Sequence, residues 1–225
     1  MTHCTHKRGL LPRRSSPGTL GDVPCSIENI ELTDAELLRP CPRLQDHVYH
    51  VFSQRYSSCA AESATSGLAL VNTIAGLSKV IYNPLSVYVF VNGGRDAGSR
   101  LDENLRRLQT HGVLREEDFP YSRGLVKPPA ELFEGADKLG EVYEIYHSST
   151  SRRVRRAKSA VHLGCPVVAG SKGHAVLIVY DDGSNYPLVL NTWDTTWGDN
   201  GFGKWDTWEA LTGTYGAWAY RTPGT

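Results

Sequence analysis

The sequence predicts an α+β fold, with a helical N-terminal half followed by a half built from antiparallel strands. Apolar residues recur at helical spacing within 57–77 and within 101–111. After residue 163 the pattern changes to short apolar runs separated by glycine, aspartate, asparagine and serine, which is typical of an antiparallel sheet or barrel. A chain of 225 residues is long for one ordinary domain and short for two, so we expect one body of two lobes.

The composition excludes two classes of partner. Lysine and arginine together number 24, and so do aspartate and glutamate, so the chain carries no net charge that would attract a nucleic acid. No stretch approaches the roughly 18 consecutive apolar residues that a membrane helix needs. We therefore expect neither a nucleic-acid partner nor a membrane partner.

The first 40 residues are predicted to form an irregular basic arm. The opening MTHCTHKRGLLPRRSSPG carries positive charges but no apolar segment of the kind found in secretory signals. The five cysteines are widely spaced and include no CxxC pair, so neither a disulfide framework nor a zinc site is expected. This cysteine usage favours an intracellular, cytoplasmic setting, and no metal or cofactor is expected.

The helical half is expected to begin in 57–77, SSCAAESATSGLALVNTIAGL. Its serines suit a helix cap, and small residues line the flank opposite the apolar face, which lets another element approach closely. A second helix is expected over 101–111, ending at Gly112. Between them PLSVYVFVN, opened by Asn83-Pro84, has the β-branched and aromatic content of a strand, and on propensity alone its assignment stays open.

The second half is expected to contain one helix and several strands. The basic stretch SRRVRRAKSAVHLG is predicted to be helical, with its arginines on a solvated face or, alternatively, forming a patch for phosphate or an acidic partner. The apolar runs CPVVAG, HAVLIVY, YPLVLNTW and YGAWAYR follow as strands. Asp181-Asp182 before Gly183 indicates a hairpin turn and not a metal site.

One cysteine, one histidine and one asparagine have the surroundings that thiol catalysis needs. Cys59 is expected at the start of a helix, where free amide groups and the helix dipole favour a thiolate. Among eight histidines, His174 alone opens an apolar strand directly after a glycine. An imidazole in this role needs a third group that orients it, and Asn191 could do so with Trp193 covering the hydrogen bond from water.

These residues stand in motifs that resemble those of the papain-like cysteine peptidases. The chain reads SSCAAES at the cysteine, GHAVLIVYDDG at the histidine and NTWDTTWGDNGFG at the asparagine. The family typically has Q-G-x-C-G-S-C-W-A-F, G-H-A-V and N-S-W-G-x-x-W-G-x-x-G-Y-G, and the last match is the most specific. The resemblance covers roughly residues 40–220.

The resemblance implies a two-lobed papain-like fold with the active site in the cleft between the lobes. We expect the papain-like domain at 41–225 after an arm at 1–40, with a helical lobe over about 50–135 and a β-barrel lobe over about 136–225. The resemblance also implies that PLSVYVFVN is a short helix.

The motif around Cys59 departs from the family at several positions. Gln54, the expected oxyanion donor, lies five residues before Cys59, whereas the family has six. Ala60 replaces an aromatic residue of the cleft wall, and Glu62 replaces an apolar aromatic and disfavours a nearby thiolate. The first 50 residues are too short for the usual inhibitory pro-segment.

Three functions remain open, and the first is an active endopeptidase of peptide or protein substrates. In it Cys59 attacks the carbonyl, His174 transfers the proton, Asn191 orients the imidazole, and the Cys59 amide with Gln54 binds the oxyanion. The second is a structural or binding component of a large assembly, such as a virion, whose protein partners would be held through the arm. The third is a Cys-His cell-wall amidase or endopeptidase.

Overall fold

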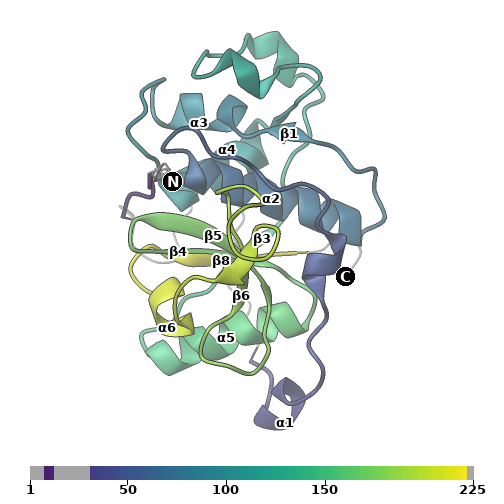
Figure 1. The fold of residues 1–225 in the computed structure, drawn as a ribbon, viewed down its shortest axis with the longest axis vertical. Helices are drawn as coiled ribbons and strands as arrows, with labels where there is room; N and C mark the ends of the chain where they lie inside the picture. The colour runs from purple at the N-terminus through teal and green to yellow at the C-terminus, as the bar shows by residue number, and fades with distance from the viewer. Residues whose placement is uncertain (1–7, 13–30, 222–225) are drawn as a thin grey trace.

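The computed structural model describes residues 8–12 and 31–221, which form two lobes stacked along the long axis of the molecule (Figure 1). The upper lobe in that view is helical, and the lower lobe is built on an antiparallel sheet. The principal helices of the upper lobe are α2 (Cys59–Ile74), α3 (Leu85–Val91) and α4 (Leu101–Thr110). The α+β architecture expected from the sequence is therefore present.

The lower lobe contains one six-stranded sheet in which every neighbouring pair of strands is antiparallel. In spatial order its strands are β3 (Val142–Glu144), β8 (Ala217–Tyr220), β4 (Val167–Ser171), β5 (His174–Tyr180), β6 (Leu188–Leu190) and β7 (Phe202–Lys204). Among the described residues, β3 and β7 are the two end strands, so the lobe is a sheet and not a barrel closed by hydrogen bonds.

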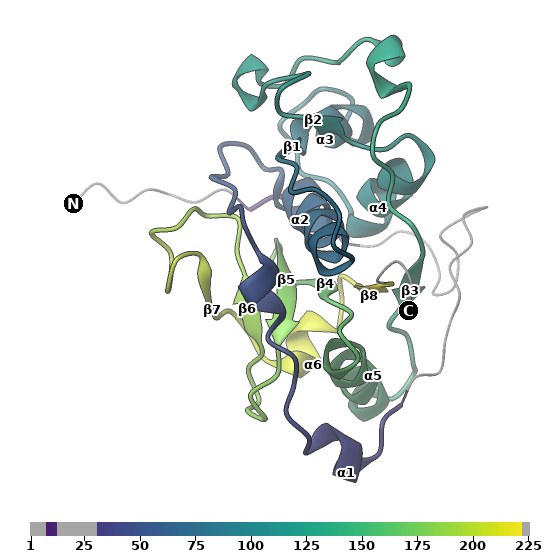
Figure 2. The same ribbon diagram turned by 90° about the vertical axis from the view of Figure 1, so that its right-hand side faces the viewer.

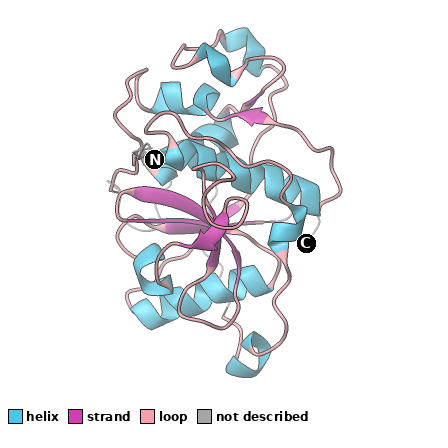
Figure 3. Cartoon of the chain, in the orientation of Figure 1, coloured by secondary structure: helices cyan, strands magenta, loops and turns pink. Residues whose placement is uncertain are grey.

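Helices cover both faces of this sheet (Figures 2 and 3). Helix α2 packs on one face, and α5 (Thr150–His162) and α6 (Trp208–Leu211) pack on the other. The close approach predicted for the small-residue flank of α2 is found at Gly67, where an added Cβ would lie 2.3 Å from the Tyr220 ring. The Tyr220 hydroxyl donates a hydrogen bond of 2.9 Å to the Ala64 carbonyl, so this contact joins the two lobes.

The remaining elements are short. They are α1 (Asp34–Leu37), the 3-10 helices η1 (Leu44–His47), η2 (Tyr121–Arg123) and η3 (Ala130–Phe133), and the paired strands β1 (Tyr82–Asn83) and β2 (Leu114–Arg115). No helix in the described part of the chain is long and apolar enough to cross a membrane.

The segment PLSVYVFVN is a helix, as the family resemblance implied, and the propensity for a strand does not prevail. The Asn83 side chain accepts the Leu85 backbone N–H at 2.9 Å, and the Ser86 hydroxyl donates to the Asn83 carbonyl at 2.7 Å. Pro84 begins the helix in the αR conformation. These local bonds provide partners for polar groups at the start of the helix. Burial of Leu85, Val87 and Tyr88 stabilises the helix by more than the weak intrinsic preference for a strand.

Helix α2 begins where the serines predicted it, but it lacks the expected cap. Ser58 occupies the N-cap position, yet its side chain accepts no hydrogen bond from a backbone amide. Its hydroxyl donates instead to the carboxyl of Glu62 at 2.7 Å. The reason is the free-energy cost of burial. A buried carboxyl oxygen without a donor costs more than an amide at the helix start without a side-chain acceptor.

The N-terminal arm is less irregular than predicted where it is described. Thr33 and Glu36 form a capping box around α1, and the guanidinium groups of α5 hold this part of the arm. Arg156 Nε lies 2.9 Å from Glu31 Oε1, and Arg155 pairs with Asp34. The basic run of α5 is thus neutralised in part by the chain's own acidic residues. Neither the solvated face nor the patch for phosphate or an acidic partner included these ion pairs.

The turn predicted at Asp181-Asp182 is present, and three of the cysteines lie within the described residues. Asp181 Oδ1 accepts the Gly183 backbone N–H at 3.0 Å in the turn between β5 and β6. Cys41, Cys59 and Cys165 are free thiols, while Cys4 and Cys25 lie outside the described residues. Within 8–12 and 31–221, no group of three or more acidic, histidine or cysteine side chains is placed to hold a metal ion.

Candidate active site

Cys59 is the first residue of α2 and lies at the junction of the two lobes. Its side chain is fully buried, with 0% exposure, and its sulfur receives a hydrogen bond from the backbone of Ala175, the residue after His174. The sulfur therefore lies against the first residues of β5. The amide groups at the start of α2 and the helix dipole favour negative charge at this position.

His174 is held at the end of its strand by a two-residue turn. Ser171 and His174 pair across the β4–β5 hairpin, and Lys172 and Gly173 between them have φ of 52° and 75°. Two successive positive φ values belong to the type I′ turn, whose twist matches that of a hairpin. The ring therefore projects from a rigid position.

His174 and Asn191 are joined by a hydrogen bond of 2.7 Å between Nε2 and Oδ1. The Asn191 atom must be the oxygen, because it also accepts the Thr192 backbone N–H at 2.7 Å. An oxygen can only accept, so the imidazole hydrogen is on Nε2. In the neutral ring Nδ1 is then the nitrogen that can accept a proton.

Two tryptophans enclose this hydrogen bond. The Trp193 indole stacks on the His174 ring with centroids 4.3 Å apart and an interplanar angle of 28°. Trp205 packs edge-on against both rings, at 5.3 Å from His174 and 5.2 Å from Trp193. The first contact was predicted. Trp205 was missed, since it lies outside the matched motif and only the fold after β7 brings it here.

Asn191 is itself fixed through the glycine-rich run that follows it. Its backbone N–H donates to the Gly201 carbonyl at 2.9 Å. Gly201 has φ of 90°, and an added Cβ would lie 2.7 Å from Val51 Cγ1. Glycine is needed at position 201 because of its positive φ and because a Cβ would clash with Val51. Gly201 therefore helps to place Asn191.

Gln54 is tied to the residue next to Asn191. Its backbone N–H donates to the Thr192 carbonyl at 2.8 Å, and its Oε1 accepts the Thr192 hydroxyl at 2.7 Å. Its Nε2 donates to the Tyr56 carbonyl at 2.7 Å. Gln54 is therefore anchored next to Asn191, although the loop to Cys59 is one residue shorter than in the family. Sequence reasoning missed Thr192, for which the only signal was its adjacency to Asn191.

The surroundings of the Cys59 thiol raise its pKa. Burial raises the pKa of Cys59 to about 11, although hydrogen bonds from the backbone of Ala175 and Gly9 lower it. The nearby Glu62 carboxyl raises the pKa of the thiol further, as its position in the first turn predicted. Ala60 is fully buried, in the same core cluster as Cys59.

Residues 8–12 cover the thiol, which the sequence did not predict. Gly9 is buried against Ser57, the residue two before Cys59, and an added Cβ on Gly9 would lie 1.8 Å from the Ser57 carbonyl oxygen. In Figure 2 this purple segment lies beside α2, where the two lobes meet. This part of the arm therefore packs within the molecule, while residues 1–7 and 13–30 lie outside the described residues.

Backbone hydrogen bonds attach this segment to both lobes. On the helical lobe, the Ser99 N–H donates to the Gly9 carbonyl at 2.7 Å, and the Leu11 N–H donates to the Ser99 carbonyl at 2.9 Å. On the sheet lobe, the Leu10 N–H donates to the Gly173 carbonyl at 3.0 Å. The Leu10 side chain is 4% exposed and lies where a Cβ on Gly170 would be, 2.0 Å from that position. The segment is thus bound by backbone hydrogen bonds to both lobes and by a buried leucine side chain.

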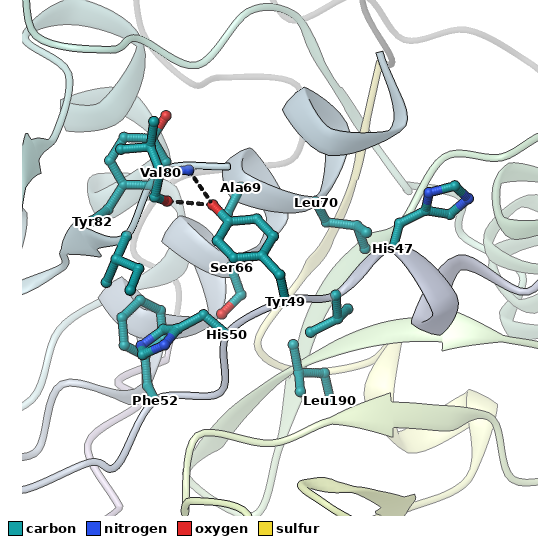
Figure 4. A pocket seen from close by; sticks show the side chains of 12 residues that line it. His47, Tyr49, His50, Phe52, Ser66, Ala69, Leu70, Val80, Tyr82 and Leu190 are labelled. Carbon is teal, nitrogen blue, oxygen red and sulfur yellow. Dashed lines mark hydrogen bonds between the residues drawn. The ribbon is translucent and has the colours of Figure 1, made fainter. Parts of the chain in front are cut away.

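A separate small pocket lies between α2 and residues 47–52 (Figure 4). There the Tyr49 hydroxyl accepts the Val80 N–H at 3.0 Å and donates to the Val80 carbonyl. None of Cys59, His174 or Asn191 lines it. It is therefore distinct from the candidate site.

No family model matches the sequence, but individual proteins do. The chain is 27% identical over 135 residues to Peptidase 1 of Euroglyphus maynei and 25% identical over 134 residues to Peptidase 1 of Dermatophagoides farinae. Each match covers 47% of this chain and 40% of the relative, so the matched part is less than half of these curated relatives. The chain is thus a distant homologue of mite Peptidase 1.

Solved structures establish the fold. Xylellain, a cysteine protease from Xylella fastidiosa, matches with a TM-score of 0.71 and 20% identity over 96% of each chain. The cysteine protease CMS1MS2 of Carica candamarcensis, solved in complex with E-64, matches with a TM-score of 0.58 and 17% identity, covering 80% of this chain and 95% of that one. The papain-like fold expected from the motifs is confirmed.

Proposed function

We propose that the chain is a papain-like thiol endopeptidase whose catalytic residues are Cys59, His174 and Asn191. The observation that carries the proposal is the 2.7 Å bond from His174 Nε2 to an Asn191 oxygen that a backbone amide identifies. This bond leaves Nδ1 as the basic nitrogen of the His174 ring. The residue after His174, Ala175, contacts the Cys59 sulfur through its backbone. The contact of the sulfur with the residue next to His174, and the orientation of the ring by Asn191, support this assignment.

The proposed reaction has two stages. His174 Nδ1 takes the proton of the Cys59 thiol, and the sulfur attacks the carbonyl carbon of the peptide bond. His174 then gives this proton to the leaving amine as the C–N bond breaks, so an acyl-enzyme remains. A water molecule, deprotonated by His174, attacks the acyl carbon and releases the acid together with the restored thiol. Asn191 holds the imidazole and stays neutral throughout.

The negative oxygen formed in each stage needs hydrogen-bond donors. We assign this role to the Cys59 backbone N–H, at the start of α2, and to Gln54 Nε2. Anchoring of Gln54 by Thr192 supports the assignment, because a donor acts best when it is already in place.

In the proposed function, residues 8–12 hold the enzyme closed. Cys59 is fully buried while Gly9 lies on it, so a peptide can reach the sulfur only after this segment leaves. A thiol with a raised pKa under a covering segment also favours a second candidate, a structural or binding protein that keeps the fold without turnover.

Digestion of an unfolded protein substrate separates these candidates. We expect the Leu10→Asp variant to generate new peptide termini, detected by mass spectrometry, and the Leu10→Asp, Cys59→Ser double variant to generate none. Equal cleavage by both would contradict the role of Cys59. No cleavage by either would favour the structural candidate, and release of fragments from peptidoglycan but not from protein would favour the cell-wall amidase.

A further inference from the structure

Glu62 is a fully buried carboxyl in the first turn of the helix that Cys59 begins. The Ser58 hydroxyl donates to its Oε1 at 2.7 Å and the Tyr121 hydroxyl at 2.9 Å. Its Oε2 is buried and has no hydrogen-bond partner among the described residues. The carboxyl thus has one oxygen with two donors and one oxygen with none.

These contacts brace the short loop between Gln54 and Cys59. At the start of the loop, the Arg55 backbone N–H donates to the Tyr121 hydroxyl at 3.3 Å. At its end, Ser58 is bound to Glu62, which is bound in turn to Tyr121. Both ends of 55–58 are therefore attached to one pair of side chains, and the loop joins the two proposed oxyanion donors.

Tyr121 is itself fixed. Its backbone N–H lies 3.0 Å from each carboxylate oxygen of Glu116, and its ring packs 6.3 Å from that of Tyr56. A side chain held at its backbone and at its ring places its hydroxyl in one position. In this position the Tyr121 hydroxyl bonds to both the Arg55 backbone N–H and the Glu62 carboxyl.

The surroundings of Glu62 favour the neutral acid. Burial raises the pKa of Glu62 to about 7, although the hydroxyls of Ser58 and Tyr121 lower it. The titratable groups that face Glu62 are the thiol of Cys59 on its own helix and the phenol of Tyr121 on η2, which is also one of its two donors. Both become negative on ionisation, and neither offers a counter-charge. With Oε1 already accepting two bonds, the proton belongs on Oε2.

We propose that Glu62 and Tyr121 are positioning residues for the oxyanion loop, and that Glu62 acts in its neutral form, so that its ionisation opposes the Cys59 thiolate. The inference rests on the proposed peptidase function. It explains how a loop one residue shorter than the family's can present the Cys59 amide and Gln54 together. It also assigns a use to a carboxyl in a place where its negative charge would disfavour catalysis.

A glutamine at position 62 separates the two parts of the proposal. Glu62→Gln keeps a carbonyl oxygen for Ser58 and Tyr121 but cannot ionise. We expect the loss of kcat/KM that the parent shows above pH 7 to be reduced in this variant, or to move by about one pH unit or more. Tyr121→Phe removes the shared hydroxyl and should lower kcat by about 10-fold or more with KM little changed.

The measurements use the full chain carrying Leu10→Asp, with hydrolysis rates and Cys59 alkylation rates recorded across pH. Glu209→Gln is the matched control, because Glu209 lies in the first turn of α6 and is exposed. Superimposable pH profiles for Glu62→Gln and the control would overturn the charge part of the proposal. An unchanged kcat in a folded Tyr121→Phe variant would overturn the positioning part.

Failure of this inference differs from failure of the proposed function. If Cys59 is alkylated selectively in a His174-dependent way but the two variants behave like the control, only the roles of Glu62 and Tyr121 are wrong. If no variant shows selective alkylation of Cys59, the peptidase proposal itself fails. If Glu62→Gln does not fold, shown by circular dichroism, Tyr121→Phe decides the positioning part and the alkaline loss of Cys59 alkylation in the parent decides the charge part.

Discussion

The backbone N–H of Leu10 donates a 3.0 Å hydrogen bond to the carbonyl of Gly173, the residue immediately before His174. Through this bond a segment far away in the chain is held directly beside the candidate catalytic histidine. The segment is bound by backbone groups and by one buried leucine side chain. Access to Cys59 is therefore coupled to the binding of residues 8–12.

Weakening this segment should expose the thiol. Leu10→Asp removes a buried leucine worth about 2 kcal/mol and puts a charge in its place, so Cys59 should be alkylated about 10-fold faster or more. The measurement is the rate of iodoacetamide labelling at Cys59 by peptide mapping. Leu38→Asp is the control, because Leu38 is 86% exposed and no such gain is expected. Equal rates in the two variants would show that residues 8–12 do not restrict access.

Loss of the orienting amide should cost activity without unfolding the protein. In the Leu10→Asp background, Asn191→Ala frees the His174 ring to turn, and a misplaced catalytic group costs about 100-fold in rate. The expected readout is a fall in kcat with KM largely retained. Asn200→Ala is a suitable control, since Asn200 lies in the same glycine-rich run but is exposed. A matching fall in the control would point to the run as a whole.

The anchoring of Gln54 gives a graded prediction. In that background Gln54→Ala should lower kcat by about 100- to 1,000-fold, the usual cost of one oxyanion donor. Thr192→Val removes only the hydroxyl that holds Gln54 Oε1 and should cost about 10-fold. Both variants should alkylate Cys59 at parental rates, since alkylation forms no oxyanion. If Thr192→Val has no effect while Gln54→Ala does, the anchor is not needed.

Glu62 should make stability depend on pH in a direction unusual for a carboxyl. Its pKa is raised from 4.5 to about 7 in the folded state, so the folded protein binds more protons between these values. The contribution is therefore fully present below pH 4.5 and lost as pH rises to about 7. Relative to Glu62→Gln, the free energy of unfolding of the parent should fall by about 3 kcal/mol across this window.

Urea unfolding at several pH values measures this difference. Glu209→Gln should run parallel to the parent, because that carboxyl is exposed. A parent curve parallel to that of Glu62→Gln over the same window would mean that Glu62 is ionised in the folded protein, contrary to its burial.

The sequence pattern was sufficient to predict the elements whose start depends on neighbouring residues. Helix α2 begins at Cys59, β5 begins at His174, and the hairpin turn after Tyr180 lies where its aspartates and glycine predicted it. Helix α3 shows the limit of propensity, because its β-branched residues form a helix when Asn83 accepts the Leu85 N–H and the lobe buries Leu85, Val87 and Tyr88.

The parts that were missed depend on contacts distant in sequence. Thr192 and Gln54 are 138 residues apart, and Tyr121 and Glu62 are 59 residues apart, so no local pattern could pair them. Leu10 likewise donates one backbone hydrogen bond to Gly173, which is distant from it in the sequence. Periodicity reports which face of an element is buried, but it does not report what covers that face.

The central claim is that His174 activates Cys59, and cysteine-resolved alkylation at neutral pH tests it most directly. In the Leu10→Asp protein, iodoacetamide should modify Cys59 well ahead of Cys41 and of the half-buried Cys165, and this selectivity should disappear in the Leu10→Asp, His174→Ala protein. Slow and equal labelling of all the cysteines, unchanged by loss of His174, would contradict the account.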